Sequence, residues 1–254
     1  MNPIVSLEDV SLRYHSIGGE TSAVSHLSLS VQAGEFISIV GPSGCGKSTI
    51  LSMLAGQLAP SEGSIYIGGT IGYMLQKDYL LQWRSIRSNA LLGLEIQKKL
   101  TPENIAYVDT LLTQYGLGDF KNSLPNQLSG GMRQRAALIR TLAVRPDILL
   151  LDEPTTYLDI AYQVEILDLL TDLNKKRNTT ILMVLHDINL SARYADYIFA
   201  MYQGRLEAQG APLKIITPGL IKKIYGLDCQ IIPDPVSRTP LVIPEGRHHK
   251  TIQA

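Results

Sequence analysis

The chain has 254 residues, of which 45% are hydrophobic and 18% are charged, enough for one large domain or for a domain with an added subdomain. Its 23 basic and 23 acidic side chains cancel, so no basic field points to a nucleic acid as partner. The two cysteines, Cys45 and Cys229, are too few for a disulfide framework. These numbers describe a globular protein with a full core that does not need an oxidising compartment.

The N-terminal sequence and the apolar runs argue against export and against a membrane span. The start, MNPIVSLEDVSL, contains two acidic residues and lacks a basic region followed by an apolar run, so it is unlike a secretory signal. The longest apolar runs, at 148–151 and 181–185, are far shorter than the roughly 20 residues that cross a bilayer. We expect a cytoplasmic protein that reaches the inner face of the cell membrane only through a partner.

Residues 1–75 show the pattern of strands separated by turns. The segments LSLSV at 27–31, FISIV at 36–40 and SIYIG at 64–68 are typical of strands. A helix is predicted from Lys47 to about Gln57. Strands therefore dominate the first third of the chain.

Residues 77–127 differ from both flanks. Helical patterns occur at about 86–99 and 103–115, and no segment has a convincing strand pattern. This stretch looks like a helical insertion in a sheet.

From residue 128 to about 210, helices and buried strands alternate. The chain ends in a proline-rich stretch, 211–254, which we expect to be a small accessory tail. Strands that alternate with helices indicate an α/β fold with a largely parallel sheet. The predicted elements, after a first helix, are the strand 148–152, the helix 160–176, the strand 180–185, the helix 188–195 and a hairpin at 199–210.

A glycine-rich segment, GPSGCGKS, lies between the predicted strand at 36–40 and the helix that follows. This is the setting of a phosphate-binding loop, in which backbone N–H groups and the helix N-terminus bind phosphates. In such a loop Lys47 reaches the β- and γ-phosphates, Ser48 binds Mg²⁺ and Thr49 adds a phosphate contact. The alternative, a tight structural turn, is disfavoured by the flanking strand and helix. The candidate nucleotide-binding residues are Gly41, Pro42, Ser43, Gly44, Cys45, Gly46, Lys47, Ser48 and Thr49.

Two carboxylates, Asp152 and Glu153, end the apolar segment DILLLDEP. Asp152 suits the Mg²⁺ shell, usually through water. Glu153 suits a general base that polarises the attacking water. Strand alternation would send the two side chains to opposite faces, so that one holds metal and the other faces the nucleophile. The alternative is a buried strand that runs out into a polar loop.

Three further side chains have weaker signals of their own. His186 ends the next buried segment, TILMVLHD, at the same predicted sheet edge as the acid pair, although such a histidine is often only structural. Gln76 follows IGYML in the manner of many surface glutamines. Tyr14 either stacks on an adenine ring or is an ordinary strand aromatic.

A second glycine-rich segment, LSGGMRQR, lies at 128–135, where a helix is predicted to begin. On its own, Ser129 is a plain helix cap. The order of motifs along the chain is Tyr14, GPSGCGKST, Gln76, LSGGMRQR, ILLLDEP, a TTYLD loop that ends at Asp159, and His186. This order resembles the nucleotide-binding domain of ATP-binding-cassette (ABC) transporters, and the resemblance covers residues 3–210.

The resemblance implies an ABC-type P-loop NTPase fold in three parts. A RecA-like core with an N-terminal antiparallel β subdomain would comprise 1–76 and 128–210. A helical subdomain would comprise 77–127, and 211–254 would be a C-terminal accessory tail.

The resemblance also implies that the second glycine-rich segment does not touch the ATP of its own chain. Two copies would pack head to tail, with Ser129, Gly130 and Gly131 facing the γ-phosphate held by Lys47 of the partner subunit. Asp159 would lie at the dimer interface. Each chain would then carry two halves of two different sites, with ATP stabilising the dimer and hydrolysis releasing it.

The same resemblance assigns further roles, cofactors and partners. His186 would contact the γ-phosphate, and Gln76 would join Ser48 and Asp152 at Mg²⁺ and link γ-phosphate occupancy to the orientation of the helical insert. That insert, 77–127, would bind a membrane permease. The implied cofactors are ATP and Mg²⁺, and the implied partners are a second copy, permease subunits and, indirectly, a solute-binding protein, with no nucleic acid.

The resemblance is not uniform along the chain. Up to about Pro154 the sequence is similar to the ATPases of nitrate, sulfonate, taurine and pyrimidine-precursor importers. From TTYLDIAYQVEIL to the tail it is similar to the ATPases of iron–siderophore importers. We interpret this as a recombined chain, natural or engineered, joined at the LLLDEP stretch that both groups share. The two halves therefore point to different solutes.

Three functions compete. The first is an import ATPase that dimerises, binds two ATP and two Mg²⁺ and drives a permease. The second is a soluble cassette ATPase in DNA repair or translation, disfavoured because the chain has neither long coiled-coil insertions nor two cassettes. The third is a regulatory cassette without hydrolysis, which the intact Lys47, Glu153 and His186 oppose. An exporter is disfavoured because no membrane helices are fused to the cassette.

Overall fold

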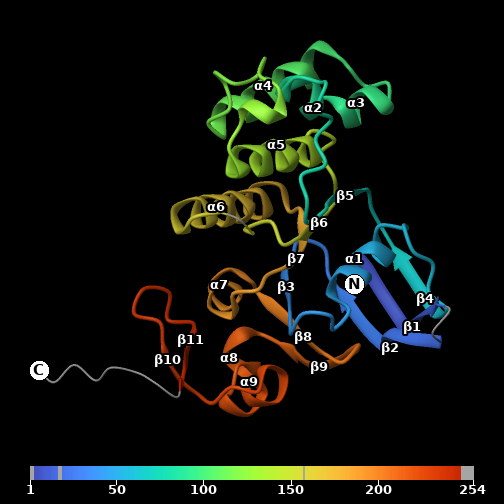
Figure 1. Cartoon of the computed structure of the whole chain (residues 1–254), viewed down its shortest axis with the longest axis vertical. Coiled ribbons are helices and arrows are strands. Elements are labelled where there is room, and N and C mark those ends of the chain that lie inside the picture. The colour runs from blue at the N-terminus through green and yellow to red at the C-terminus, as the bar shows by residue number, and fades with distance from the viewer. Residues whose placement is uncertain (1–2, 17–18, 157, 247–254) are drawn as a thin grey trace, which may run out of the picture.

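The structure is a computed structural model that describes residues 3–16, 19–156 and 158–246. A six-stranded sheet with the order β5-β6-β7-β3-β8-β9 forms its centre (Figure 1). Five strands are parallel, and β9 pairs antiparallel with β8. The bounds are β3 Phe36–Val40, β5 Ile71–Met74, β6 Ile148–Asp152, β7 Thr180–Val184, β8 Tyr197–Tyr202 and β9 Arg205–Gly210.

The apolar composition of the central strands fits their burial. Every residue of β3, β6 and β7 is buried, as expected for parallel strands covered on both faces. The predicted strand segments at these three places agree with the observed bounds to within one residue. An α/β fold with a largely parallel sheet is therefore confirmed.

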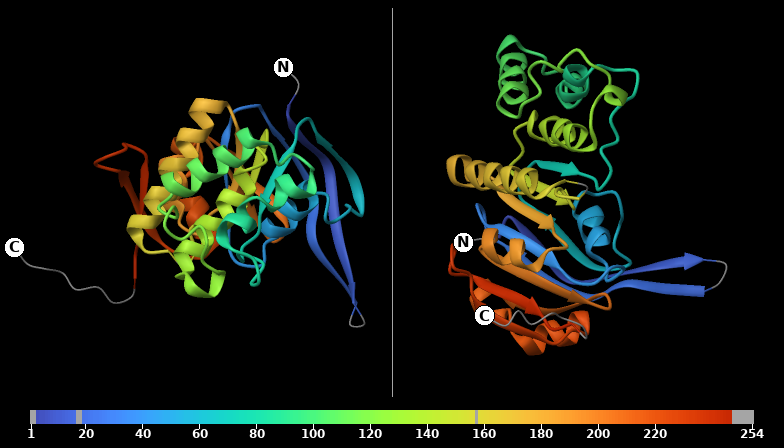
Figure 2. Two further views of the ribbon diagram at one scale, coloured as in Figure 1. Left: turned by 90° about the horizontal axis from the view of Figure 1, so that it is seen from above. Right: turned by 60° about the vertical axis from the view of Figure 1, so that its left-hand side comes forward.

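A second sheet, with the order β2-β1-β4, is antiparallel and lies beside the central sheet and α1 (Figure 2). This confirms the predicted N-terminal antiparallel β subdomain. The strand predicted at 27–31 is only the end of β2, because the outer half of that strand is exposed and lacks an apolar pattern. The bounds are β1 Val5–Ser16, β2 Gly19–Val31 and β4 Glu62–Ile67.

Helices cover the sheet and form a separate layer at the top of Figure 1. Within the described chain, residues 77–127 hold helices and no strand. The helix predicted over about 86–99 is two short helices that meet at Leu91, and the second ends at Ile96. A Cβ on Gly93 would lie 2.8 Å from Val144, so this glycine permits close packing on the segment that follows α5. The bounds are α1 Lys47–Leu54, α2 Ile86–Ala90, α3 Leu92–Ile96, α4 Pro102–Gln114, the 3₁₀ turn η1 Pro125–Gln127, α5 Gly130–Leu142, α6 Ile160–Arg177 and α7 Ile188–Tyr194.

The described part of the tail, 211–246, is folded onto the main body. It contains the helices α8 (Pro212–Ile215) and α9 (Pro218–Tyr225) and the hairpin strands β10 (Cys229–Pro233) and β11 (Pro240–Pro244). Five of its buried apolar residues belong to the same apolar cluster as the central sheet; they are Ile216, Ile221, Ile224, Cys229 and Val242. Among the described helices, none is both long and apolar enough to span a bilayer.

Candidate nucleotide site

The sheet order brings the predicted motifs to one edge. β5, β6, β7 and β3 are neighbours and run parallel, so their carboxyl ends meet at the same side of the sheet. β3 leads into the glycine-rich loop, β5 is followed by Gln76, β6 ends at Asp152 and β7 is followed by His186. This edge is where open α/β sheets bind ligands.

The glycine-rich loop wraps around the amino end of α1. Gly46, with φ 101°, is the N-cap of α1, and a Cβ there would lie 2.5 Å from the carbonyl oxygen of Ala23. Only glycine fits such a backbone in so small a space. The Lys47 ammonium is buried and donates to the carbonyl oxygens of Gly41 at 2.8 Å and Pro42 at 2.9 Å. The loop thus holds a cation and a helix N-terminus side by side, which suits a bound anion.

Ser48 and Asp152 meet across the gap between α1 and β6. The Ser48 hydroxyl donates to Asp152 Oδ1 at 3.1 Å. Burial raises the pKa of Asp152, although the bond from Ser48 lowers it in part. The described residues hold no group of three or more His, Cys, Asp or Glu side chains that could bind a metal alone. A hydroxyl and one carboxylate fit Mg²⁺, which binds proteins through few carboxylates together with substrate phosphates and water.

Glu153 is the centre of a hydrogen-bonded group. Its Oε1 lies 2.5 Å from Nε2 of His186, and its Oε2 accepts from Gln76 Nε2 at 2.8 Å and from Thr156 Oγ1 at 3.1 Å. Burial raises the pKa of Glu153, but the bonds from His186 and Gln76 outweigh it and hold that pKa below its ordinary value. The carboxylate is therefore ionised at neutral pH and has its partners in place.

The two adjacent carboxylates diverge, but not for the predicted reason. Asp152 is the last residue of β6, and Glu153 already lies outside the strand with a φ of 54°. A non-glycine residue in this left-handed region is uncommon. The prediction that strand alternation separates the pair is wrong, because the chain turns sharply between Asp152 and Pro154 and carries Glu153 toward His186 and Gln76.

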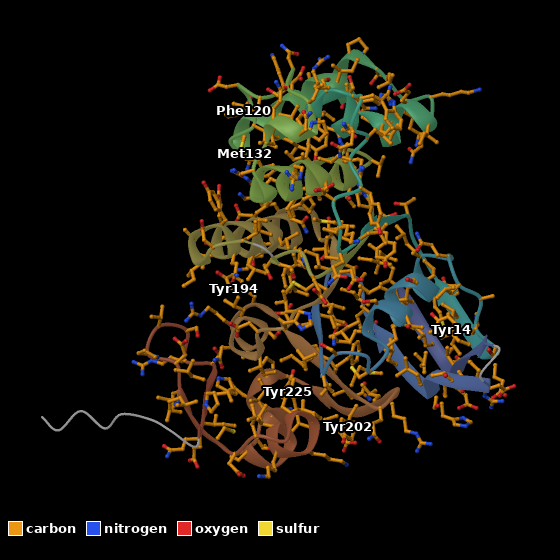
Figure 3. The ribbon with its side chains drawn as sticks, viewed as in Figure 1. Tyr14, Phe120, Met132, Tyr194, Tyr202 and Tyr225 are labelled. Atoms are coloured by element: carbon orange, nitrogen blue, oxygen red, sulfur yellow. The ribbon has the colours of Figure 1, made fainter. Side chains whose placement is uncertain are left out.

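A cavity of about 520 Å³ is bounded by the glycine-rich loop, Gln76, Glu153 and His186, whereas Asp152 does not line it. Tyr14, which Figure 3 labels on β1, stands at its wall with 44% of its surface exposed. The other lining residues are Thr21, Ser22, Ala23, Ser43, Gly44, Gly46, Lys47, Ser48, Thr49, Gln76, Glu153 and His186. A larger cavity, of about 720 Å³, lies at the opposite edge of the sheet, near Arg145 and Arg177, and has no phosphate loop.

The remaining predicted residues lie outside the 520 Å³ cavity. Ser129 is the N-cap of α5, where its Oγ accepts from the N–H of Met132 at 3.3 Å, and both Ser129 and Gly130 are exposed. Asp159 is the exposed N-cap of α6. A Cβ on Gly131 would lie 3.0 Å from Leu158, so this glycine packs against the segment before α6.

Four residues at the site were not predicted from the sequence. Thr156 bonds to Glu153, and Thr21, Ser22 and Ala23 of β2 line the cavity. The threonine follows Pro154 within the predicted loop, so its position three residues after Glu153 was the only available signal. The β2 residues carry no local signal, since tertiary packing brings them to the loop.

Known proteins resemble the chain closely. The ABC transporter family model matches residues 24–156. The ferric enterobactin transport ATP-binding protein FepC of Escherichia coli is 36% identical over 94% of this chain and 93% of its own. The taurine import ATP-binding protein TauB of Ruegeria pomeroyi is 35% identical over 88% of this chain and 82% of its own.

Solved structures give the same result. The ATP-binding cassette MJ0796, in a dimeric post-hydrolysis state with ADP and phosphate, has a TM-score of 0.76 and 32% identity, covering 82% of this chain and 98% of its own. A metal-chelate type ABC transporter in an inward-facing conformation has a TM-score of 0.84 and 25% identity, covering 97% of this chain and 99% of its own. With the motifs and the fold in agreement, the chain belongs to the ABC transporter family, as an ATP-binding subunit with ATPase activity.

Proposed function

We propose that the chain energises solute import as one half of a head-to-tail ATP-bound dimer attached to a separate membrane permease. The observation that carries this proposal is a contrast in exposure. Lys47 and its glycine-rich loop line one cavity together with Gln76, Glu153 and His186, whereas Ser129 and Gly130 are exposed at the start of α5, a helix whose later turns are buried.

The first task of the site is to hold the triphosphate. The loop N–H groups and Lys47 bind the β- and γ-phosphates, and the ammonium exchanges its bonds to Gly41 and Pro42 for phosphate oxygens. Ser48, Asp152 and Gln76 would hold Mg²⁺, which would offset part of the negative charge on the phosphate oxygens.

The second task is to activate water. Glu153 is ionised and accepts hydrogen bonds at both oxygens. His186, whose side chain is 50% exposed, rotates from Glu153 Oε1 toward the γ-phosphate and leaves that oxygen to accept a proton from water. Gln76 keeps its hydrogen bond to the other oxygen of Glu153. Because Gln76 directly precedes the helical segment 77–127, it links γ-phosphate occupancy to the orientation of that segment.

The third task, closing the site, needs a second copy. Ser129, Gly130 and Gly131 supply the helix N-terminus that faces the γ-phosphate of the partner subunit, and Asp159 lies at the interface between copies. The dimeric state of the structurally similar cassette MJ0796 supports this arrangement.

The same proposal assigns a role to each part of the chain. Residues 1–76 and 128–210 are the core with its β subdomain, 77–127 binds the permease, and 211–254 is the C-terminal tail. The chain works at the inner face of the cell membrane, held there by the permease and served indirectly by a solute-binding protein.

For the solute we propose an iron–siderophore class. Three relatives named for such transport are 36%, 38% and 38% identical, and the first two cover 94% and 98% of the chain, the tail included. A second candidate, a taurine-, sulfonate- or nitrate-like solute, is supported by the taurine import relative, which covers 88%. Cells that lack the chain should lose siderophore-dependent iron uptake and keep taurine uptake; the reverse pattern favours the second candidate.

The proposal is tested by hydrolysis in the purified chain and in its permease complex. The parent chain should hydrolyse Mg²⁺-ATP, and Glu153→Gln should bind ATP normally with a rate reduced about 100-fold. The permease should co-purify with both proteins. A parent chain that does not hydrolyse ATP even with its permease would support the regulatory cassette instead, and co-purification with DNA or ribosomes would support the soluble cassette.

A further inference from the structure

The tail hairpin, which comprises β10, β11 and the turn between them (229–244), packs against the helix that follows His186. α7 begins at Ile188 with Asp187 as its N-cap, so His186 lies directly before its first turn. Figure 1 shows the hairpin beside α7, far from the helical layer at the top. Any contact that fixes α7 therefore also fixes the backbone that carries His186.

An ion pair between the buried Asp234 and the more exposed Arg193 joins the hairpin to the last turn of α7. Arg193 Nη2 donates to Asp234 Oδ2 at 2.6 Å, and Asp234 is only 4% exposed. Asp234 Oδ1 accepts from the N–H groups of Val236 at 2.8 Å and Ser237 at 2.9 Å. One carboxylate thus closes the hairpin turn with one oxygen and holds α7 with the other, in the charge-assisted geometry that makes strong hydrogen bonds.

An amide clamp joins the hairpin to the first turn of α7. Asn189 Oδ1 accepts from the N–H of Val242 at 2.7 Å, and its Nδ2 donates to the carbonyl of the same residue at 3.2 Å. Within the described chain β11 pairs only with β10, so this face of the strand has no strand neighbour. The Asn189 side chain satisfies both backbone groups of the buried Val242 as a neighbouring strand would.

α7 also contacts β3 and α6. The Ser191 hydroxyl accepts from Ser38 of β3 at 3.0 Å, and the Tyr194 hydroxyl, labelled in Figure 3, donates to Asp168 of α6 at 2.9 Å. The hairpin differs from these because it holds α7 at both ends, through Asn189 near His186 and through Arg193 one turn later.

We propose that Asn189, Arg193 and Asp234 are positioning residues for ATP hydrolysis, through which the tail hairpin aligns His186 with Glu153 and the γ-phosphate. This inference rests on the proposed roles of His186 and Glu153. It assigns the tail a part in the chemistry, although no tail residue up to Gly246 that the structure describes lines the nucleotide cavity.

The test uses full-length variants that separate alignment from folding. Asp234→Asn keeps the oxygen that closes the turn and removes the charge that holds Arg193. Arg193→Gln breaks the same ion pair by removing the charge of its more exposed member. Arg193→Lys keeps a positive charge opposite Asp234. Tyr194→Phe is the matched control, because it removes one hydrogen bond of α7 that does not involve the hairpin.

We expect kcat for Mg²⁺-ATP to fall roughly tenfold in Asp234→Asn and in Arg193→Gln, a loss typical of a misplaced reacting group. Arg193→Lys should recover most of it, and Tyr194→Phe should keep the parent kcat. The Kd for ADP should not change, because ADP lacks the γ-phosphate. In a His186→Ala background, Asp234→Asn should cause no further loss.

Three results would overturn the inference. They are a parent-like kcat in both pair variants, an equal loss in Tyr194→Phe, or an undiminished loss in the His186→Ala background, which would mean a merely structural role. If Asp234→Asn does not fold, the comparison of Arg193→Gln with Arg193→Lys decides. A parent-like kcat in His186→Ala itself would instead refute the proposed role of that histidine.

Discussion

Two glycine-rich helix starts in this chain have opposite surroundings. At α1, Gly46 is packed against Ala23, and Lys47 is buried within a cavity that also holds Glu153. At α5, a Cβ on Gly130 would have only one described neighbour within 4 Å, the guanidinium of Arg133 at 4.0 Å. The local chemistry is similar, yet only the first start has catalytic groups beside it. This contrast fits the proposed dimer, in which the second start completes a site on the partner subunit.

The largest effect is expected from mixing two inactive variants. Lys47→Ala disables the first start and Ser129→Arg blocks the second, so each homodimer has two defective sites. A mixed dimer has one site with both defects and one that is intact, so an equal mixture should recover about a quarter of the parent ATPase rate. The rate is measured over a range of mixing ratios.

The mixing experiment contains its own controls. Each variant alone must be inactive, and circular dichroism must show that both are folded. A mixture that stays as inactive as its components would refute the head-to-tail exchange of parts.

A smaller effect is expected at the wall of the first site. Tyr14→Ala should weaken ATP binding about tenfold through loss of stacking on the base, whereas Tyr14→Phe should bind ATP as the parent does. Calorimetric titration with ATP and with inorganic triphosphate checks this. Equal weakening for both ligands would show that Tyr14 supports the loop and does not contact adenine.

The smallest effect is expected in the tail and depends on pH. Hydrogen bonds from Ser237, Arg193 and Val236 hold the pKa of Asp234 well below its ordinary value. Because the pKa of Asp234 is lower in the folded protein than in the unfolded chain, the ionised carboxylate stabilises the fold at neutral pH. This stabilisation is lost as the pH falls from the ordinary pKa of 3.8 toward the lower pKa of the folded protein. Asp234→Asn should therefore melt a few degrees below the parent at pH 7, and this difference in melting temperature should become smaller in acid. A difference that does not depend on pH would contradict this.

The nucleotide edge could be predicted from the sequence because its signals are local. β3, β6 and β7 are largely apolar segments, and each is followed by polar residues at the carboxyl end of its strand. Parallel pairing then brings those ends together without further information.

The rest could not be predicted because it depends on distant contacts and on backbone geometry. The left-handed turn at Glu153 has no composition signal, since most such turns contain glycine. Asn189 and Val242 bond across 53 residues, so neither residue predicts the other. The tail consequently appeared as a proline-rich appendage, although its described part shares the main core.

The hypothesis of a recombined chain stays a prediction. Separate phylogenies of 1–150 and 156–254 would test it, and two trees that agree would remove it. The Arg193–Asp234 pair lies wholly within the second segment, so such a join would leave that contact intact.

The most direct test of the central claim is the mass of Glu153→Gln in solution with and without Mg²⁺-ATP. Light scattering across a concentration series should show a monomer with ADP and a dimer with ATP, and adding Ser129→Arg should abolish the dimer. A Glu153→Gln chain that binds ATP yet remains monomeric at every concentration, and also as a single copy in its permease complex, would contradict the account.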